Sequence, residues 1–212
     1  MTQITLDITM SLDGFVAGPN ATLEDPLGEN GMLLHEWVFP LKSFRAQHGG
    51  EGGEENTDDA LLARNLAPVA ATVMGRKMFS GGDGPWDADP NAGGWWGDDP
   101  PFRTSVFVVT HHAREPLTFP NGTTFHFVTA GVESAIAQAR EAAGEKDVRV
   151  SGGASVATQA FDLGLLHRID LHVAPILLGG GVRLFAGADL TRLELVESSA
   201  SDKVAHLSYR PT

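Results

Sequence analysis

The fold of this chain is decided by a short segment that reads Val150-Ser151-Gly152-Gly153-Ala154-Ser155. Residues 147–150 predict a strand, and residues 154–163 have the spacing of a helix that ends at Gly164. Two glycines between a strand and a helix let backbone N–H groups and the positive end of the helix dipole meet a phosphate. A tight strand-to-helix connection without a ligand is the alternative interpretation of the same residues.

Strands and helices alternate around this segment. Helices are predicted at residues 58–65 and 132–143, and further strands at residues 4–10, 70–74, 105–110, 124–128 and 169–173. Residues 193–199 and 203–210 form a final hairpin of two strands with no helix between them. Because parallel strands need crossover connections, this order predicts a mainly parallel sheet with an antiparallel edge hairpin. We expect one domain over residues 1–212.

Composition narrows the possible partners. The 212 residues include 15 basic and 27 acidic side chains, a formal net charge of −12 that repels a nucleic-acid backbone. The absence of cysteine excludes disulfides, thiolate metal sites and a cysteine nucleophile. No signal peptide is visible, and no apolar run approaches the roughly 20 residues of a membrane span. We therefore expect a cytoplasmic protein without a nucleic-acid or membrane partner.

Three segments are less regular. Residues 31–41 have apolar side chains at helical spacing and predict a short helix that ends near Pro40, and Thr57 is expected to cap the helix of residues 58–65. Residues 49–55 have no apolar side chain and predict a flexible insertion. Residues 81–101 are rich in glycine and proline and contain three tryptophans, which is typical of a functional or interface loop.

Two further motifs suit a ligand. Met74-Gly75-Arg76-Lys77 places two cations at the carboxyl end of a buried strand, where open α/β sheets bind ligands, although a solvated helix start is the alternative. The three glycines of residues 179–181 permit either close backbone approach or a bulge. The sequence lacks Rossmann, P-loop, nucleophile-elbow and zincin motifs. His35-Glu36 and His111-His112 have no partners at ligand spacing, so no metal site is expected.

In order along the chain, five motifs resemble the reductase domain of riboflavin biosynthesis and its stand-alone relatives in the dihydrofolate-reductase-like superfamily. They are Ser11-Leu12-Asp13-Gly14-Phe15-Val16-Ala17, Met74-Gly75-Arg76-Lys77, Val108-Val109-Thr110, Ser151-Gly152-Gly153-Ala154 and Ala174-Pro175-Ile176-Leu177-Leu178-Gly179-Gly180-Gly181. The resemblance covers nearly the whole chain. It leaves out residues 49–55, the glycine insertion, and residues 81–101, the tryptophan loop. It implies a three-layer α/β fold with helices on both faces of the sheet, NADPH across the carboxyl ends of the strands, and often a homodimer.

The resemblance also implies which residues bind NADPH. Gly75, Arg76 and Lys77 match the part of the family motif at the adenosine-side phosphates, and Thr110 with His111 matches the strand end beside it. The pair Arg76 and Lys77 favours NADPH over NADH. The remaining matches are the pyrophosphate turn, Gly152, Gly153, Ala154, Ser155 and Val156, and the wall near the nicotinamide, Thr9, Val16 and Ala17.

The substrate is less defined by this resemblance. In true dihydrofolate reductases an acidic residue of the first helix polarises the pterin, and Glu36 is the candidate here. The zinc ligands of the deaminase domain that accompanies the riboflavin-pathway reductase are absent. We expect a stand-alone reductase for a planar substrate, pterin-like or ribosylaminopyrimidine-like, whose pocket is lined by Asp13, His35, Glu36, Trp37 and Trp86. A non-catalytic dinucleotide-binding protein that retains the fold and a flavin-dependent relative are the alternatives.

Overall fold

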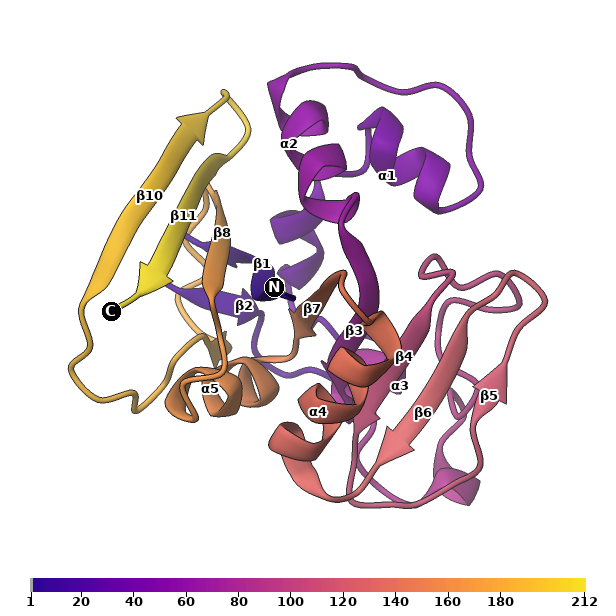
Figure 1. Ribbon diagram of the computed structural model, residues 1–212. Helices are drawn as coiled ribbons and strands as arrows, with labels where there is room; N and C mark the ends of the chain where they lie inside the picture. The colour runs from indigo at the N-terminus through magenta and orange to yellow at the C-terminus, as the bar shows by residue number, and fades with distance from the viewer. Residues whose placement is uncertain (1) are drawn as a thin grey trace.

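A nine-stranded sheet forms the centre of the molecule in the computed structural model, which describes residues 2–212 (Figure 1). The strand order is β10-β11-β8-β1-β7-β3-β4-β6-β5, and every pairing from β8 to β6 is parallel. The parallel strands are β1 (Ile4–Ser11), β3 (Val69–Gly75), β4 (Ser105–Val109), β6 (Thr124–Val128), β7 (Asp147–Gly152) and β8 (Arg168–Ala174). Antiparallel strands flank them: β10 (Leu193–Ala200) and β11 (Ala205–Pro211) at one edge and β5 (Leu117–Thr118) at the other. The predicted sheet and C-terminal hairpin are confirmed.

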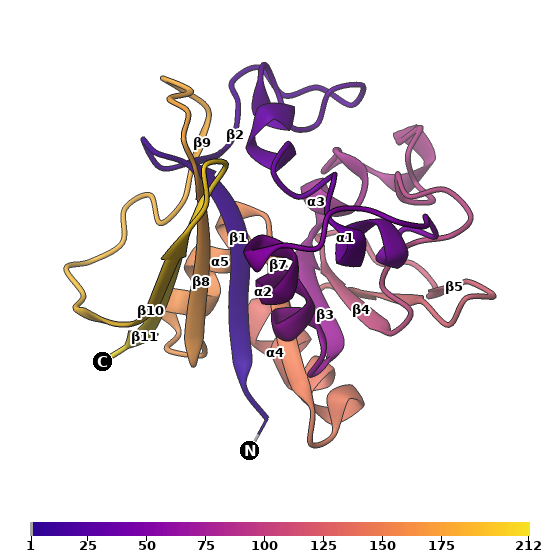
Figure 2. The same ribbon diagram turned by 90° about the horizontal axis from the view of Figure 1, so that it is seen from above.

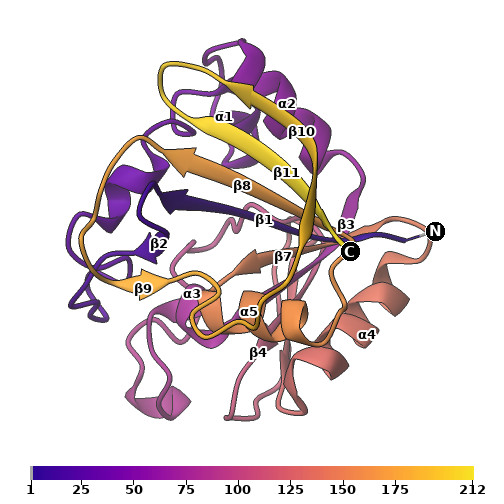
Figure 3. The ribbon, with the colours of Figure 1, turned by 90° about the vertical axis from the view of Figure 1, so that its left-hand side faces the viewer.

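Helices cover both faces of this sheet, as Figures 2 and 3 show. On one face, α4 (Gly131–Ala143) packs against β3 and β4, and α5 (Ala154–Asp162) packs against β7. On the other face lie α1 (Lys42–Gln47) and α2 (Thr57–Leu66). The α4 and α5 face holds the main apolar core, to which the strands contribute alternate side chains such as Ile4, Leu6 and Ile169. The predicted three-layer fold is therefore confirmed.

A second sheet joins two loops at the carboxyl edge. Strand β2 (Phe15–Ala17) pairs antiparallel with β9 (Val182–Arg183). The third glycine of residues 179–181 is required here, because a Cβ on Gly181 would lie 2.1 Å from the carbonyl oxygen of Ala17. The close backbone approach that the glycine run permits is therefore observed, and it is made to another part of the chain.

The segment before α2 differs from the prediction in two ways. Residues 31–41 are not one helix: a 3-10 helix, η1 (Gly31–His35), is followed by turns, and α1 begins only after Leu41. Pro40 separates these turns from α1, because a proline disfavours the helical conformation of the residue before it. The cap of α2 is Asn56 rather than Thr57, and its side chain accepts the Asp59 amide at 3.0 Å.

The glycine insertion is fastened at its end. The Glu54 amide donates to the Pro40 carbonyl at 2.8 Å, and the Glu54 carbonyl accepts the Lys42 amide at 3.0 Å. A Cβ on Gly53 would lie 2.7 Å from Lys42. Residues 53 and 54 are thus held against the start of α1 rather than being a free tether.

The tryptophan loop packs on the molecule. It follows α3 (Arg76–Ser80) and contains η2 (Trp86–Ala88). Trp86 and Trp96 pack against Phe79, and Trp96 also stacks on Phe125 with 5.9 Å between the ring centroids. The loop therefore closes a second apolar cluster beside β4 and β6.

Candidate functional site

The carboxyl ends of the parallel strands meet at one edge, and the turn from β7 to α5 lies there. Gly152 has a φ of +126°, which favours glycine, and Gly153 caps α5 without a side-chain hydrogen bond. The peptide bond between these two glycines is cis. A helix begins with N–H groups that have no intrahelical acceptor, so the first turn of α5 presents the amides of Ala154, Ser155 and Val156. This geometry suits an anion.

Gly75 is required by packing at the same edge. A Cβ at this position would lie 3.2 Å from the Cγ2 atom of Val156 and 3.5 Å from the Gly153 amide nitrogen. The end of β3 can therefore lie close to the start of α5 only when its last residue is small.

Arg76 faces inward rather than toward the edge. Its side chain is 5% exposed, and its Nη2 donates to Asp89 Oδ2 at 2.5 Å. The guanidinium carbon lies 3.6 Å from the centroid of the Trp86 ring. Burial raises the pKa of Asp89, but the hydrogen bonds from Ser80 and Arg76 outweigh it and lower that pKa below the usual value. Arg76 therefore holds the tryptophan loop in this structure.

The other candidates for contact with the adenosine-side phosphates are Lys77, His111 and Thr110. Lys77 is exposed, pairs with Asp83 at 3.0 Å, and borders a depression of about 320 Å³ between residues 21–23 and 81–85. His111 is exposed just after β4, whose end pairs with the end of β3. Thr110 is buried, and its hydroxyl accepts the His112 amide at 3.1 Å. Lys77 and His111 are thus the side chains of this group that a ligand can reach.

A cavity of about 150 Å³ lies between the sheet and the η1–α1 segment. Three of the sequence candidates, Thr9, His35 and Trp37, line it together. Trp37 donates from Nε1 to the Thr9 hydroxyl at 3.3 Å, so its packing role and its place in the cavity wall are both observed. Burial lowers the pKa of His35. The cavity is therefore partly aromatic and partly polar.

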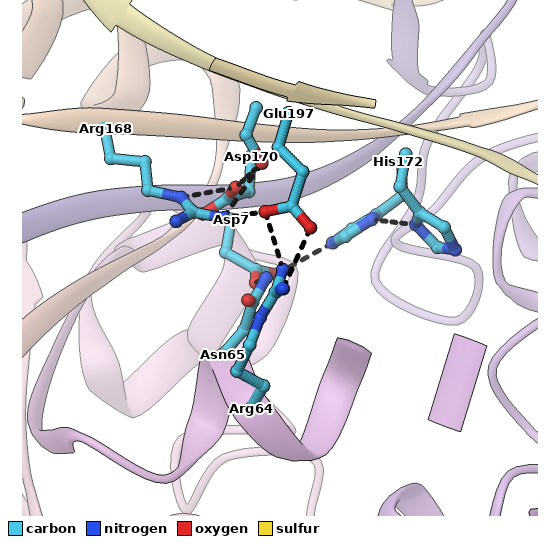
Figure 4. A network of polar contacts seen from close by, with 9 residues as sticks. Asp7, Arg64, Asn65, Arg168, Asp170, His172 and Glu197 are labelled. Carbon is cyan, nitrogen blue, oxygen red and sulfur yellow. Dashed lines mark hydrogen bonds and ion pairs between the residues drawn. The ribbon is translucent and has the colours of Figure 1, made fainter. Parts of the chain in front are cut away.

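The sheet side of this cavity is a polar network (Figure 4). Asp7 of β1 accepts Arg149 Nη2 at 2.8 Å and Asn65 Nδ2 at 3.3 Å, and it lies 3.4 Å from His172 Nε2. Burial raises the Asp7 pKa, but Arg149 and His172 more than offset it, so the pKa is well below its usual range. Ser151 Oγ, Arg149 Nε and His172 Nε2 are buried there without hydrogen-bond partners. Each of these atoms lacks the hydrogen bond that a buried polar atom normally makes.

Three substrate candidates lie elsewhere. Glu36 is exposed after η1 and does not line the cavity. Trp86 is half-buried with the Arg76 guanidinium over its ring, and it does not line the cavity. Asp13 fastens a turn: it accepts the Leu178 and Gly179 amides at 3.1 and 2.7 Å, and the Ser11 hydroxyl at 2.6 Å.

Asp13 is held in its charged form by these contacts. The Ser11 hydroxyl is the largest cause of its lowered pKa, which the two backbone amides lower further. The other two cofactor candidates near this turn, Val16 and Ala17, lie in β2 and do not line the cavity.

Comparison with known families identifies the chain. The profile of the RibD C-terminal domain matches residues 2–207. This chain belongs to the RibD C-terminal domain family. Membership makes it a relative of riboflavin-pathway reductases and confirms the resemblance found in the sequence. A comparison with the sequences of curated proteins finds no match.

Solved structures share the fold of this RibD C-terminal domain. A Shewanella sp. PV-4 protein, provisionally described as a riboflavin biosynthesis protein, is 20% identical, with a TM-score of 0.62 and coverage of 100% of this chain and 99% of its own. A pyrimidine reductase-like protein from Corynebacterium diphtheriae is 17% identical, with a TM-score of 0.53 and coverage of 100% and 92%. Acinetobacter baumannii RibD is 17% identical, with a TM-score of 0.56; the match covers this whole chain but only 58% of that protein.

The sequence analysis did not predict the polar residues on the cavity side of the sheet in this RibD C-terminal domain. Its residues alternate with core residues along three neighbouring strands, as Asp7 and Thr9 do in β1 and Asp170 and His172 do in β8. Alternation is normally typical of a strand with one solvated face. Here α2 and Trp37 cover that face. The sequence signal that could have identified a covered polar face is the number of charged residues at period two in strands that pair with each other.

Proposed function

We propose that this chain is a reductase that uses NADPH to reduce a small planar heterocycle, pterin-like or ribosylaminopyrimidine-like. The observation that carries this proposal is the contact between the glycine turn and the cavity. A Cβ on Gly152 would lie 3.4 Å from Met78 Sδ and 3.6 Å from Ile8 Cδ1, and both of these side chains line the cavity. An anion-binding turn and a partly aromatic pocket are therefore contiguous, as a dinucleotide and its substrate require.

The residues of the turn fit a pyrophosphate. The position of a Cβ on Gly153 has no atom within 4 Å, so the space beside the helix start is open. The amides of Ala154, Ser155 and Val156 would hold the phosphates through hydrogen bonds aligned with the helix dipole. When bound, NADPH supplies the hydride.

The preference for NADPH would rest on Lys77 and His111. Both are exposed at the ends of neighbouring strands, whereas Arg76 is already bound by Asp89. An ammonium group that exchanges Asp83 for a ribose phosphate keeps a charge-assisted contact. This assignment moves the phosphate contact from Arg76 to its neighbour.

The substrate would lie in the cavity beside Trp37. An aromatic wall suits a planar ring, and the unpartnered Ser151 Oγ and Arg149 Nε suit ring carbonyl or amine groups. The Thermotoga maritima structure with this fold is described as a 5-amino-6-(5-phosphoribosylamino)uracil reductase combined with a deaminase. That compound is the first substrate to test.

A homodimer is part of the proposal. Strand β10 lies at the edge of the sheet and exposes Leu195 and Val196, and an edge strand with apolar side chains is a surface for pairing with a second copy. Light scattering with size-exclusion chromatography measures the mass, and a monomer at all concentrations would refute this point.

Calorimetry with NADPH and NADH tests the cofactor site. Ser155→Asp adds a carboxylate to the first turn of α5, which suits the helix dipole but repels a phosphate, so we expect at least about tenfold weaker binding, or 1.4 kcal/mol. The matched control is Ser134→Asp in α4, because each serine accepts a hydrogen bond from the glutamine four residues later. Equal affinities of the two variants would refute the assignment of the turn.

Turnover separates the enzyme from its alternative. We expect loss of the reduced-nicotinamide absorbance when 5-amino-6-(5-phosphoribosylamino)uracil or a dihydropterin is added. Saturable NADPH binding without oxidation by either compound would favour the non-catalytic dinucleotide-binding protein. An absence of NADPH binding would refute both the reductase and the non-catalytic dinucleotide-binding protein.

A further inference from the structure

Two buried histidines face each other beside the cavity. His172 of β8 and His206 of β11 are directly opposite in the antiparallel register, and each is 3% exposed. Their Nδ1 atoms are 2.7 Å apart. Trp37 packs on both rings, with centroid distances of 5.0 and 5.2 Å. At this distance a single proton lies between the two Nδ1 atoms, so one ring donates and the other accepts.

Asp58 of α2 decides which ring accepts. Its Oδ1 atom lies 3.1 Å from His206 Nε2, and its Oδ2 atom accepts the Ser201 hydroxyl at 2.8 Å. A carboxylate only accepts hydrogen bonds, so the His206 proton is on Nε2. Burial is the largest cause of the lowered pKa of His206, followed by the charge of His172, and both favour a neutral ring. The Nδ1 atom of His206 is therefore the acceptor.

The tautomer of His206 also fixes the tautomer of His172, which lines the cavity. Its Nδ1 atom must donate to His206, so Nε2 is the ring nitrogen of His172 that the pair does not use. Figure 4 shows His172 pointing toward Asp7 from the neighbouring strand, and Nε2 lies 3.4 Å from Asp7 Oδ1 without a hydrogen bond. This atom is the only ring nitrogen of the pair without a hydrogen-bond partner.

Four charged or titratable groups face Nε2 of His172. The facing groups are Asp7 from β1, Arg149 from β7, His206 from β11 and His35 on the η1 side of the cavity. Asp7 is a carboxylate, and Arg149 already donates to it at 2.8 Å. Burial lowers the pKa of His35 and so favours its neutral form. One negative group therefore lies beside Nε2, and the one fixed positive group is already paired with it.

We propose that His172 donates the proton of the reduction from Nε2, with His206 and Asp58 as positioning residues that fix its tautomer. This inference rests on the proposed function. When bound, NADPH would supply the hydride to the carbon of a C=N or C=O bond of the substrate. The electron pair of that bond moves to the heteroatom, which takes the Nε2 proton. His172 is left neutral with its proton on Nδ1, and water reprotonates Nε2 after product release.

A structural role alone does not explain these contacts. Buried charged networks are often no more stable than well-packed apolar side chains of similar volume. The other three ring nitrogens make hydrogen bonds, whereas Nε2 makes only a 3.4 Å ion pair with Asp7. Nε2 lies among residues that line a cavity, together with the unpartnered Ser151 Oγ.

Nuclear magnetic resonance tests the tautomer without any substrate. In protein with ¹⁵N-labelled histidine, a coupling across the Nδ1–H···Nδ1 hydrogen bond identifies the pair in the unmodified protein. We expect one ring to keep its proton on Nδ1 while its Nε2 signal moves with pH, and the other to remain in the Nε2–H form. Asp58→Asn is expected to add signals of the second tautomer. A His172 ring that stays in the Nε2–H form at all pH values would overturn the proposal.

Kinetics test the proton transfer. We expect His172→Gln to lower kcat about 100-fold or more while the Kd for NADPH changes less than about twofold. The fall of wild-type kcat with rising pH is expected to disappear in this variant and to shift in Asp58→Asn. His126→Gln is the control, because His126 is a half-buried histidine that stacks on Phe107 and does not line the cavity. It is expected to keep the wild-type rate.

The outcomes separate the two proposals. If the wild type oxidises NADPH with substrate and His172→Gln keeps both its rate and its pH profile, the proton donor is wrong and the reductase stands. If the wild type neither binds nor oxidises NADPH, the reductase fails. The resonance experiment then still decides the tautomer, because it needs neither cofactor nor substrate.

Discussion

The buried pair of Arg76 and Asp89 allows a quantitative test of the role of Arg76. The two side chains are 5% and 4% exposed, and Asp89 also accepts Ser80 Oγ and the Asn91 amide, each at 2.8 Å. Asp89→Asn keeps the shape but leaves the guanidinium charge buried under Trp86. Removing one partner of a buried pair costs about 3–5 kcal/mol. Since asparagine retains part of the hydrogen bonding, we expect the lower end, about 3 kcal/mol of unfolding free energy.

Urea unfolding followed by tryptophan fluorescence measures this loss. With 2–4 °C per kcal/mol for a chain of this length, the melting temperature is expected to fall by about 6–12 °C. Asp83→Asn is the matched control, because it is the same change in the same loop at an exposed pair with Lys77. Exposed pairs contribute at most about 1 kcal/mol. An Arg76→Met, Asp89→Leu double variant is expected to recover most of the loss, since an apolar pair leaves no buried charge.

Two results would refute this reasoning. Equal unfolding midpoints for Asp89→Asn and Asp83→Asn would mean that the buried pair adds no stability. A double variant as unstable as the sum of the single variants would mean that the two side chains do not interact.

Three further predictions follow from the site. Lys77→Ala is expected to weaken NADPH binding about tenfold and leave NADH binding unchanged, because only NADPH offers the additional phosphate; an equal loss for both in calorimetry would contradict this. Gly152→Ala is expected to lose more than about 1 kcal/mol in urea unfolding, because its φ of +126° strains any other residue, and wild-type stability would show that the turn adopts another conformation. The lowered pKa of Asp7 predicts that its contribution to stability is complete above the ordinary aspartate pKa, near 4, and is lost as pH falls below it. Acid unfolding of Asp7→Asn should therefore depend less on pH than that of the wild type, and parallel curves would be inconsistent with an ionised Asp7.

The fold and the glycine turn could be predicted because their signals are local. A strand, two glycines and a helix start occupy adjacent residues, 150–155, and the alternation of strands and helices fixes the direction of the sheet. The helix predicted for residues 31–41 shows the limit of periodicity. The apolar spacing is real, but the pattern cannot tell 3-10 and other turns from an α-helix.

The candidate site was less predictable because its contacts join distant residues. Arg76 turns inward because Asp89, thirteen residues later in a loop without periodicity, accepts its hydrogen bond. The sequence does not show that α2 covers the polar side of β1 and β8, so Asp7 and His172 have the pattern of solvated residues. Thr9 could be named because the family resemblance places it near the nicotinamide, and His35 and Trp37 because it places the substrate pocket at the first helical segment.

The position of β1 has a consequence for how the chain folds. Its neighbours are β7 and β8, so Leu6 pairs with Val150 on one side and with Ile169 on the other. During synthesis the first strand must therefore remain without either neighbour until more than two thirds of the chain has left the ribosome. Pairing over such sequence separations is slow, and unpaired apolar strands are prone to aggregate. Nascent chains that stop before residue 147 lack both partners of β1, and during that interval the apolar side chains of β1, among them Ile4 and Leu6, are uncovered and can be bound by a chaperone.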